Sequence, residues 1–150
     1  DNIFAKYNDH TLPKPFSKSD SQYVETSAKI DSSISPINRI QSSPISLSDS
    51  FGNPINQIFS DMQIQIVGNI ENKISFDQEF IYFFQIKNSN EAIISLSWIK
   101  GQLSPNQILD VSQSWIPDKS DTYLIETYIW NSLTEFMPMS PSTSTLTLVE

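Results

Sequence analysis

Residues that could do acid–base or nucleophilic chemistry are sparse in this 150-residue sequence. The single histidine, His10, lies in a polar stretch, and we expect a solvated side chain there instead of a catalytic base or half of a two-histidine metal site. The sequence has no cysteine, which excludes thiol catalysis and thiolate metal sites. Its three glycines, Gly52, Gly68 and Gly101, are far apart and form no phosphate-binding loop.

Acidic residues offer two further hypotheses. Glu126 with Asp118 and Asp121 could supply the paired carboxylates of a glycoside hydrolase, and the two aspartates could supply oxygen ligands to calcium. However, the turn sequence PDKSD lacks the regular ligand spacing of a calcium loop, and acidic residues in surface turns are usually solvated. We therefore predict that the chain is not an enzyme and holds no metal or cofactor.

The three tryptophans, Trp98, Trp115 and Trp130, could form an aromatic platform for a sugar. Each stands beside aliphatic residues in an expected strand, so we predict that at least two of them pack in the core. Trp130 is the candidate for exposure, because the polar residues Asn131 and Ser132 follow it. A surface glycan, or a neighbouring cell that carries one, is thus a candidate partner.

The composition limits the classes of partner. Seventeen acidic against nine basic residues give a net charge of −8, which would repel nucleic acid and anionic membranes. A hydrophobic content of 38% and an aromatic content of 11% favour a folded domain. No stretch approaches the roughly 20 apolar residues of a membrane span. Because the chain starts at Asp1, we expect a mature chain, extracellular or on the cell surface after removal of a signal peptide.

The expected elements are organised around residues 79–98, EFIYFFQIKNSNEAIISLSW, which predict a β-hairpin with its turn at 88–91. The first arm is apolar on both faces, which is typical of a strand covered on both sides. In the second arm one face is apolar and the other is rich in serine. We expect the apolar face, Ile94, Leu96 and Trp98, to be buried.

Further short strands precede and follow this hairpin from about residue 43 onward. About seven strands at spacings of 8–12 residues, without a helical period, predict an all-β sandwich. We assign residues 43–150 to this sandwich.

The stretches LSWIKGQLSPNQ, SWIPDKSDTYLIETYIW and STLTLVE resemble the immunoglobulin-like modules of archaeal secreted and cell-surface proteins. The resemblance extends over roughly residues 45–150 and implies an immunoglobulin-like β-sandwich. Modules of this kind serve as stalks, adhesins, surface-layer proteins and pilus or filament subunits. Where the family usually has glycine before "TY", this sequence has Ser120-Asp121.

Residues 1–42 predict an extended N-terminal arm. The first 21 residues are polar and contain Pro13 and Pro15, which disfavour helix. Their short apolar patch, Ile3, Phe4 and Tyr7, supplies candidate anchors for the arm.

Residues 22–34 show period-2 alternation over 11 residues, which has two interpretations. In the first, the segment is an ordinary first strand of its own sandwich, and the chain before it is a tail. In the second, it is a donor strand that completes the sheet of the next subunit, as in strand-addition complexes. The side chains that would enter the neighbour are Val24, Thr26, Ala28, Ile30 and Ile34.

The sequence therefore predicts a structural subunit of an extracellular filament or surface lattice, whose partners are copies of itself added head to tail. The alternative is a monomeric cell-surface adhesin, or an immunoglobulin-like module that binds carbohydrate or protein. The location of Val24, Ile30 and Ile34, between chains or within one, distinguishes the two.

Overall fold

The most apolar stretch of the sequence forms β4 (Gln78–Lys87), the central strand of the structure, a computed structural model that describes residues 34–150. Phe80, Tyr82, Phe84 and Ile86 point into the core, as expected for one side of a packed sheet. Ile81 and Phe83, on the opposite side of the strand, are buried as well. On this outer side the rings of Trp98 and Trp130, from the two neighbouring strands, lie beside Phe83, and this explains why both faces of β4 can be apolar.

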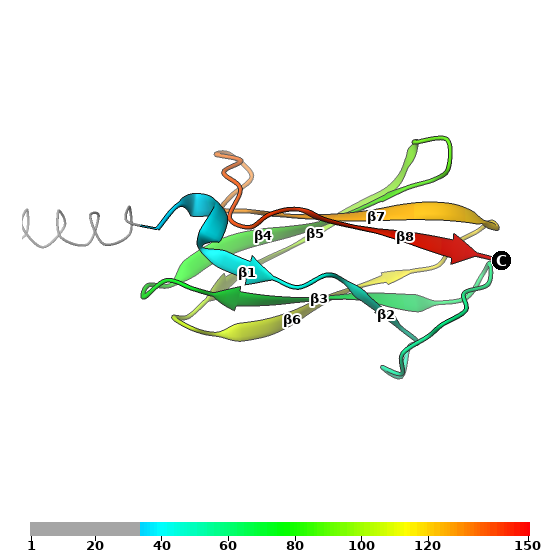
Figure 1. The fold of residues 1–150 in the computed structure, drawn as a ribbon, viewed down its shortest axis with the longest axis horizontal. Helices are drawn as coiled ribbons and strands as arrows, with labels where there is room; N and C mark the ends of the chain where they lie inside the picture. The colour runs from blue at the N-terminus through cyan, green and yellow to red at the C-terminus, as the bar shows by residue number, and fades with distance from the viewer. Residues whose placement is uncertain (1–33) are drawn as a thin grey trace, which may run out of the picture. The chain divides into compact units, whose positions relative to one another are not determined.

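Two antiparallel sheets face each other in this fold (Figure 1). In sheet 1, β3 pairs with β1 and β2 along one edge and with β6 along the other. In sheet 2 the strand order is β5-β4-β7-β8. After a short 3₁₀ helix, η1 (Pro36–Asn38), the strands are β1 (Ile40–Ser42), β2 (Ser46–Ser48), β3 (Ile64–Asn72), β4, β5 (Ile93–Leu103), β6 (Ile108–Trp115), β7 (Asp121–Trp130) and β8 (Thr143–Val149).

This arrangement confirms the expected all-β, immunoglobulin-like sandwich. The eight strands correspond closely to the expected seven, because β1 and β2 are two short pieces along the same edge of β3. Residues 35–150 form a compact unit, so Ile40–Ser42, which the sequence analysis placed in the arm, belong to sheet 1. The described chain enters this unit at one end, and its C-terminal residue lies at the other (Figure 1).

A hydrogen bond at the start of β7 is typical of immunoglobulin-like sandwiches. The Tyr123 hydroxyl donates a hydrogen bond of 2.9 Å to the backbone carbonyl of Lys119, four residues earlier. This is the geometry of a tyrosine corner. The Tyr123 ring also packs edge-on against Trp115, with ring centroids 4.9 Å apart. The "TY" sequence therefore fixes the chain where it crosses from sheet 1 to sheet 2.

The buried side chain of Asn72 ties together two loops at one end of the sandwich. Its amide nitrogen lies within hydrogen-bond distance of the carbonyls of Phe76, Leu103 and Ser104, at 2.8, 3.2 and 3.1 Å. Its carbonyl oxygen accepts a bond of 3.1 Å from the Ile74 backbone N–H. Asn72 therefore joins the β3–β4 loop to the end of β5.

Candidate functional site

Most of the arm lies outside the described residues. This applies to the candidate anchors Ile3, Phe4 and Tyr7, to His10, and to four of the donor-strand side chains, Val24, Thr26, Ala28 and Ile30. Ile34, the last residue of the candidate donor strand, directly precedes the compact unit. The site is therefore built from the surface that the sandwich offers to a partner.

Two of the three carboxylates considered for catalysis or calcium, Asp121 and Glu126, accept hydrogen bonds. Asp121 accepts bonds from the backbone N–H groups of Ser89 and Thr122, at 3.3 and 2.7 Å, while Asp118 is exposed. Hydrogen bonds from the side chain and backbone of Ser89 lower the pKa of Asp121. Within residues 34–150, no group of three histidine, cysteine, aspartate or glutamate side chains is placed to hold a metal ion.

Strand β5 forms one edge of sheet 2 and runs for 11 residues alongside β4. A β-bulge near its start leaves Ile94 as an extra residue, because Ile93 pairs with Lys87 and Ser95 with Ile86. Beyond the bulge the inward-facing residues are small or of moderate size, Ser95, Ser97 and Ile99, opposite the large inward side chains of β4.

The expectation that Ile94, Leu96 and Trp98 are buried is wrong. Leu96 is 52% exposed and Trp98 is 49% exposed, and both lie on the outer face of sheet 2, the face turned away from sheet 1. The core already holds the large inward aromatic side chains of β4, so the opposite positions of β5 take serine, as the pair Phe84 and Ser97 shows. The apolar side of β5 is thus left outside.

A row of aromatic rings crosses the outer face of sheet 2. Phe83 on β4 lies between Trp98 on β5 and Trp130 on β7, with ring centroids 6.1 and 4.5 Å away. Phe136, from the β7–β8 connection, packs edge-on against Trp130 at 5.3 Å. Trp115 is the one tryptophan that packs in the core, whereas Trp130 is partly buried on the outer face, so the expectation that at least two of the three pack in the core is wrong. The most exposed one is Trp98, not Trp130.

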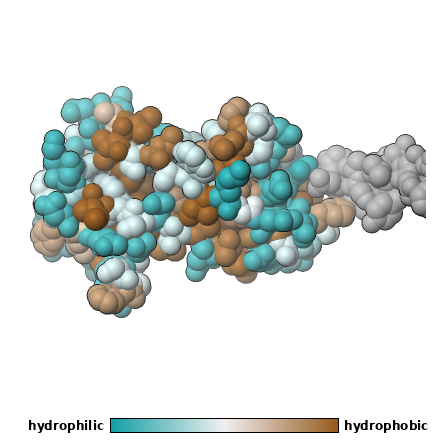
Figure 2. Space-filling model, turned by 180° about the vertical axis from the view of Figure 1, so that it is seen from behind, coloured by the Kyte–Doolittle hydropathy of each residue, from teal (hydrophilic) through white to brown (hydrophobic). Residues whose placement is uncertain are grey.

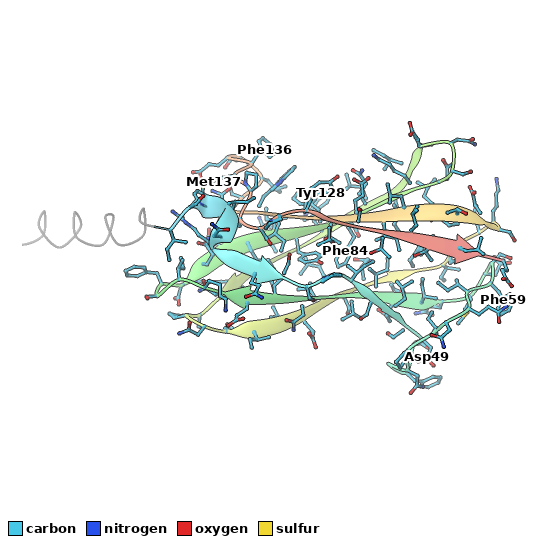
Figure 3. All side chains as sticks on the ribbon, viewed as in Figure 1. Asp49, Phe59, Phe84, Tyr128, Phe136 and Met137 are labelled. Carbon is cyan, nitrogen blue, oxygen red and sulfur yellow. The ribbon has the colours of Figure 1, made fainter. Side chains whose placement is uncertain are left out.

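A polar cluster stands on the same face beside the aromatic row. Glu126 forms an ion pair of 3.0 Å with Lys87 and accepts bonds from the Tyr128 hydroxyl at 2.7 Å and from Gln85 at 3.4 Å. The bond from Tyr128 and the ammonium of Lys87 lower the pKa of Glu126, and the same bond raises the pKa of Tyr128. Figure 3 shows Phe84 between the two sheets and Tyr128 on the outer side.

Further apolar side chains are exposed at the edges of the outer face. On β8 they are Leu146 and Leu148, and at the start of β5 they are Ile93 and Ile94. Figure 2, which shows the side opposite to Figure 1, has several apolar patches separated by polar atoms.

Two open hollows lie at the ends of the edge strands. One of about 400 Å³ lies next to the aromatic row, lined by backbone and side chains that include Ile81, Lys100, Gln102, Asn131 and Leu133. Another of about 460 Å³ lies between β1 and the start of β8, where the hydroxyls of Ser42 and Ser140 are hydrogen-bonded at 2.8 Å. Their linings mix apolar and polar groups and contain no set of catalytic side chains.

Sequence comparison finds no match, either among family models or among curated proteins. Among solved structures, the chain is similar to the C-terminal domain of Wzt, with a TM-score of 0.64 and 12% identity over 75% of this chain and 74% of that chain. It is also similar to a CARDB domain from Pyrococcus furiosus, with a TM-score of 0.51 and 9% identity over 75% of this chain and 94% of that one.

A third similarity is to Bacteroides uniformis β-glucuronidase 2, with a TM-score of 0.56 and 13% identity over 70% of this chain. There the matched region is 13% of the enzyme, so this chain corresponds to a small part of a much longer protein. No helix within residues 34–150 is long and apolar enough to cross a membrane. At these identities the similarities concern the fold, and together with the tyrosine corner they establish an immunoglobulin-like β-sandwich.

Proposed function

We propose that this chain is a structural subunit of an extracellular filament or surface lattice, and that residues 22–34 add as a strand to a neighbouring copy. The observation that carries the proposal is that the sandwich is complete without this segment. Both sheets are formed by residues 40–149, with β1 and β2 on one edge of sheet 1 and β8 on one edge of sheet 2. An alternating segment that precedes a complete sandwich is available for another molecule.

Strand addition needs an open edge, and the sandwich offers several. The strands β5, β6 and β8 each pair with one neighbour along their length in the part of the chain that the structure describes. Backbone hydrogen bonds along such an edge provide affinity, and alternate side chains provide specificity. Because the donor segment and an edge strand are different surfaces of the subunit, the contact is heterologous and can repeat without closing. Repetition of this contact produces a filament.

Negative-stain microscopy of the full chain and of residues 35–150 tests the proposal. The shortened version keeps η1, every strand and the buried core, so it should fold. Filaments or large assemblies from the full chain, with single particles from residues 35–150, are the expected result. Single particles from both versions would exclude the donor strand, and assemblies from both would place polymerisation within the sandwich.

A second function, the binding of a glycan by a monomeric cell-surface module, is favoured by a separate observation. The hollow of about 400 Å³ is lined by Lys100 and Asn131, which follow Trp98 and Trp130 closely in the sequence, and by Gln102. Aromatic faces beside polar groups are suited to sugar rings, and concave sites of this size hold small ligands.

Tryptophan fluorescence measures this binding directly. Titration of the full chain with a panel of neutral and acidic oligosaccharides should change the emission of Trp98, and Trp98→Ala should abolish the change. An unchanged spectrum with every oligosaccharide would remove this second function.

A further inference from the structure

We infer that the acceptor for residues 22–34 is the open edge of β5 in a neighbouring copy, an inference that rests on the proposed function. The added strand would extend sheet 2 to the order donor-β5-β4-β7-β8. It would also cover the side of the sandwich where the edges of β5 and β6 lie near each other.

Length distinguishes β5 from the other edges. It is 11 residues long, whereas β6 has eight, β8 has seven, and β1 and β2 have three each. The alternating part of the donor, residues 24–34, also has 11 residues. The end of β8 is moreover occupied, since Val149 forms a bridge with Ile58 and Glu150 bonds to Ile58 and Ser60. Of these edge strands, only β5 is as long as the alternating part of the donor.

The inner side of the β5 edge carries side chains that are small or only partly buried. Ser95 and Ser97 point inward and are small, and Ile99 is only partly buried. On sheet 1, Leu109 of β6 is also partly buried against the core. The hydroxyl of Ser97 is buried without a hydrogen-bond partner among the described residues. A strand beside β5 would cover Ile99 and Leu109 and bring hydrogen-bonding groups near Ser97.

Charge favours β5 as well. The donor segment carries Glu25, Lys29 and Asp31, two carboxylates against one ammonium, so its net charge is −1. The single charged residue of β5 is Lys100, whereas that of β6 is Asp110, and β8 has none. Of the three long edge strands, β5 is the one whose charge is opposite to that of the donor.

The position of β1 limits how much of the segment can pair with β5 of its own copy. Ser35 begins the compact unit just before β1, which is on the edge of sheet 1 opposite to β6. Two strand spacings of about 4.8 Å and a sheet separation of about 10 Å put β5 about 14 Å away. Crossing that distance takes about four extended residues. A donor that ends at Ile34 could then pair along only part of β5, so the complete pairing requires a second copy.

Engineered disulfides test the assignment, because the chain has no cysteine of its own. Ala28 is near the middle of the donor segment, and neighbouring strands place facing residues at a distance that a disulfide can span. The double variants Ala28→Cys with Ser95→Cys, Ser97→Cys or Ile99→Cys are oxidised with copper–phenanthroline and separated on a non-reducing gel. Ala28→Cys with Thr145→Cys, on β8, is the matched control, and Ala28→Cys alone controls for bonds between two arms.

The inference predicts a ladder of covalent multimers from at least one β5 variant and none from the two controls. A ladder from the Thr145 variant, an intramolecular disulfide in the β5 variants, or no β5 ladder at all would overturn it. Comparison of the full chain with residues 35–150 distinguishes failure of the β5 assignment from failure of the proposed function. If truncation abolishes assembly but no β5 ladder forms, the acceptor is another edge. If truncation changes nothing, the proposed function fails too.

Discussion

Phe83 and Trp98 face each other directly across β4 and β5, with ring centroids 6.1 Å apart, yet Phe83 is 6% exposed and Trp98 is 49% exposed. The boundary between the covered and the open part of the outer face therefore lies between these two adjacent strands. Within residues 34–150 no further strand follows β5 in sheet 2, so Trp98 has a neighbouring strand on one side alone. A strand added beside β5 would continue the covered region outward.

This difference in burial predicts very different costs of truncation. In residues 35–150, Phe83→Ala should lower the free energy of unfolding by about 3–5 kcal/mol, because it empties a packed position. Trp98→Ala should cost about 1 kcal/mol, since roughly half of its side chain is already in water. Urea denaturation followed by circular dichroism measures both. If both variants lose the same free energy of unfolding, the side chain of Trp98 is as well covered as that of Phe83, and β5 is not an open edge.

The contact between Gly68 and Tyr82 provides a second prediction. Tyr82 is buried on β4 and reaches across the core to β3, where a Cβ on Gly68 would lie 2.2 Å from its hydroxyl oxygen and 2.7 Å from Cζ. Gly68→Ala should therefore lower the free energy of unfolding by about 1–3 kcal/mol, the usual cost of overpacking.

Removing the hydroxyl is the matched test of this contact. Burial raises the pKa of Tyr82, and the interaction of its hydroxyl with the Thr127 side chain lowers the pKa by a smaller amount. Tyr82→Phe alone should change stability by less than about 1 kcal/mol. Combined with Gly68→Ala it should recover part of the loss, since the closer of the two atoms is gone. If the effects of Gly68→Ala and Tyr82→Phe on thermal unfolding add fully in the double variant, the methyl group added at position 68 does not collide with the Tyr82 hydroxyl.

The sequence predicted the strands correctly, but it did not predict which side of the edge strand β5 faces the core. The apolar run of β4 predicted a strand covered on both sides, and Phe80, Ile81, Tyr82, Phe83, Phe84 and Ile86 are all buried. Such patterns are local, because burial follows the two-residue period of the strand. The number of strands and the sandwich followed from the same pattern and from the turn residues between the strands.

The exposure of Trp98 could not be predicted in this way. Alternation separates the two sides of β5, but it does not say which side faces sheet 1. That choice depends on the register with β4, which places Ser97 opposite Phe84 and Trp98 opposite Phe83. The tyrosine corner was likewise present as the letters "TY", but its bond to Lys119 depends on the path of the turn.

Stability against acid should depend on Glu126. The bond from Tyr128 and the ammonium of Lys87 hold the folded pKa of Glu126 below its ordinary value of 4.5. A lowered folded pKa stabilises the fold above about pH 4.5, and this contribution is lost as the pH falls through the folded pKa. Glu126→Gln should therefore show a smaller fall in Tm between pH 6 and pH 3 than the parent chain.

Tyr128→Phe is the companion variant for this pH series. It removes the largest cause of the lowered pKa and leaves the carboxylate in place. The pKa of Glu126 should then move upward toward its ordinary value, and the loss of stability in acid should be smaller than in the parent chain. If Tm falls equally in all three proteins between pH 6 and pH 3, protonation of Glu126 does not contribute to the loss of stability in acid.

Hydrogen–deuterium exchange on β5 tests the central claim most directly. The account predicts that backbone amides of Ile93–Leu103 that face the open edge exchange rapidly in residues 35–150 and become protected in the assembled full chain. Amides of β6 and β8 should change little between the two samples. Equal exchange on β5 in both samples, or new protection confined to β6 or β8, would contradict strand addition at this edge.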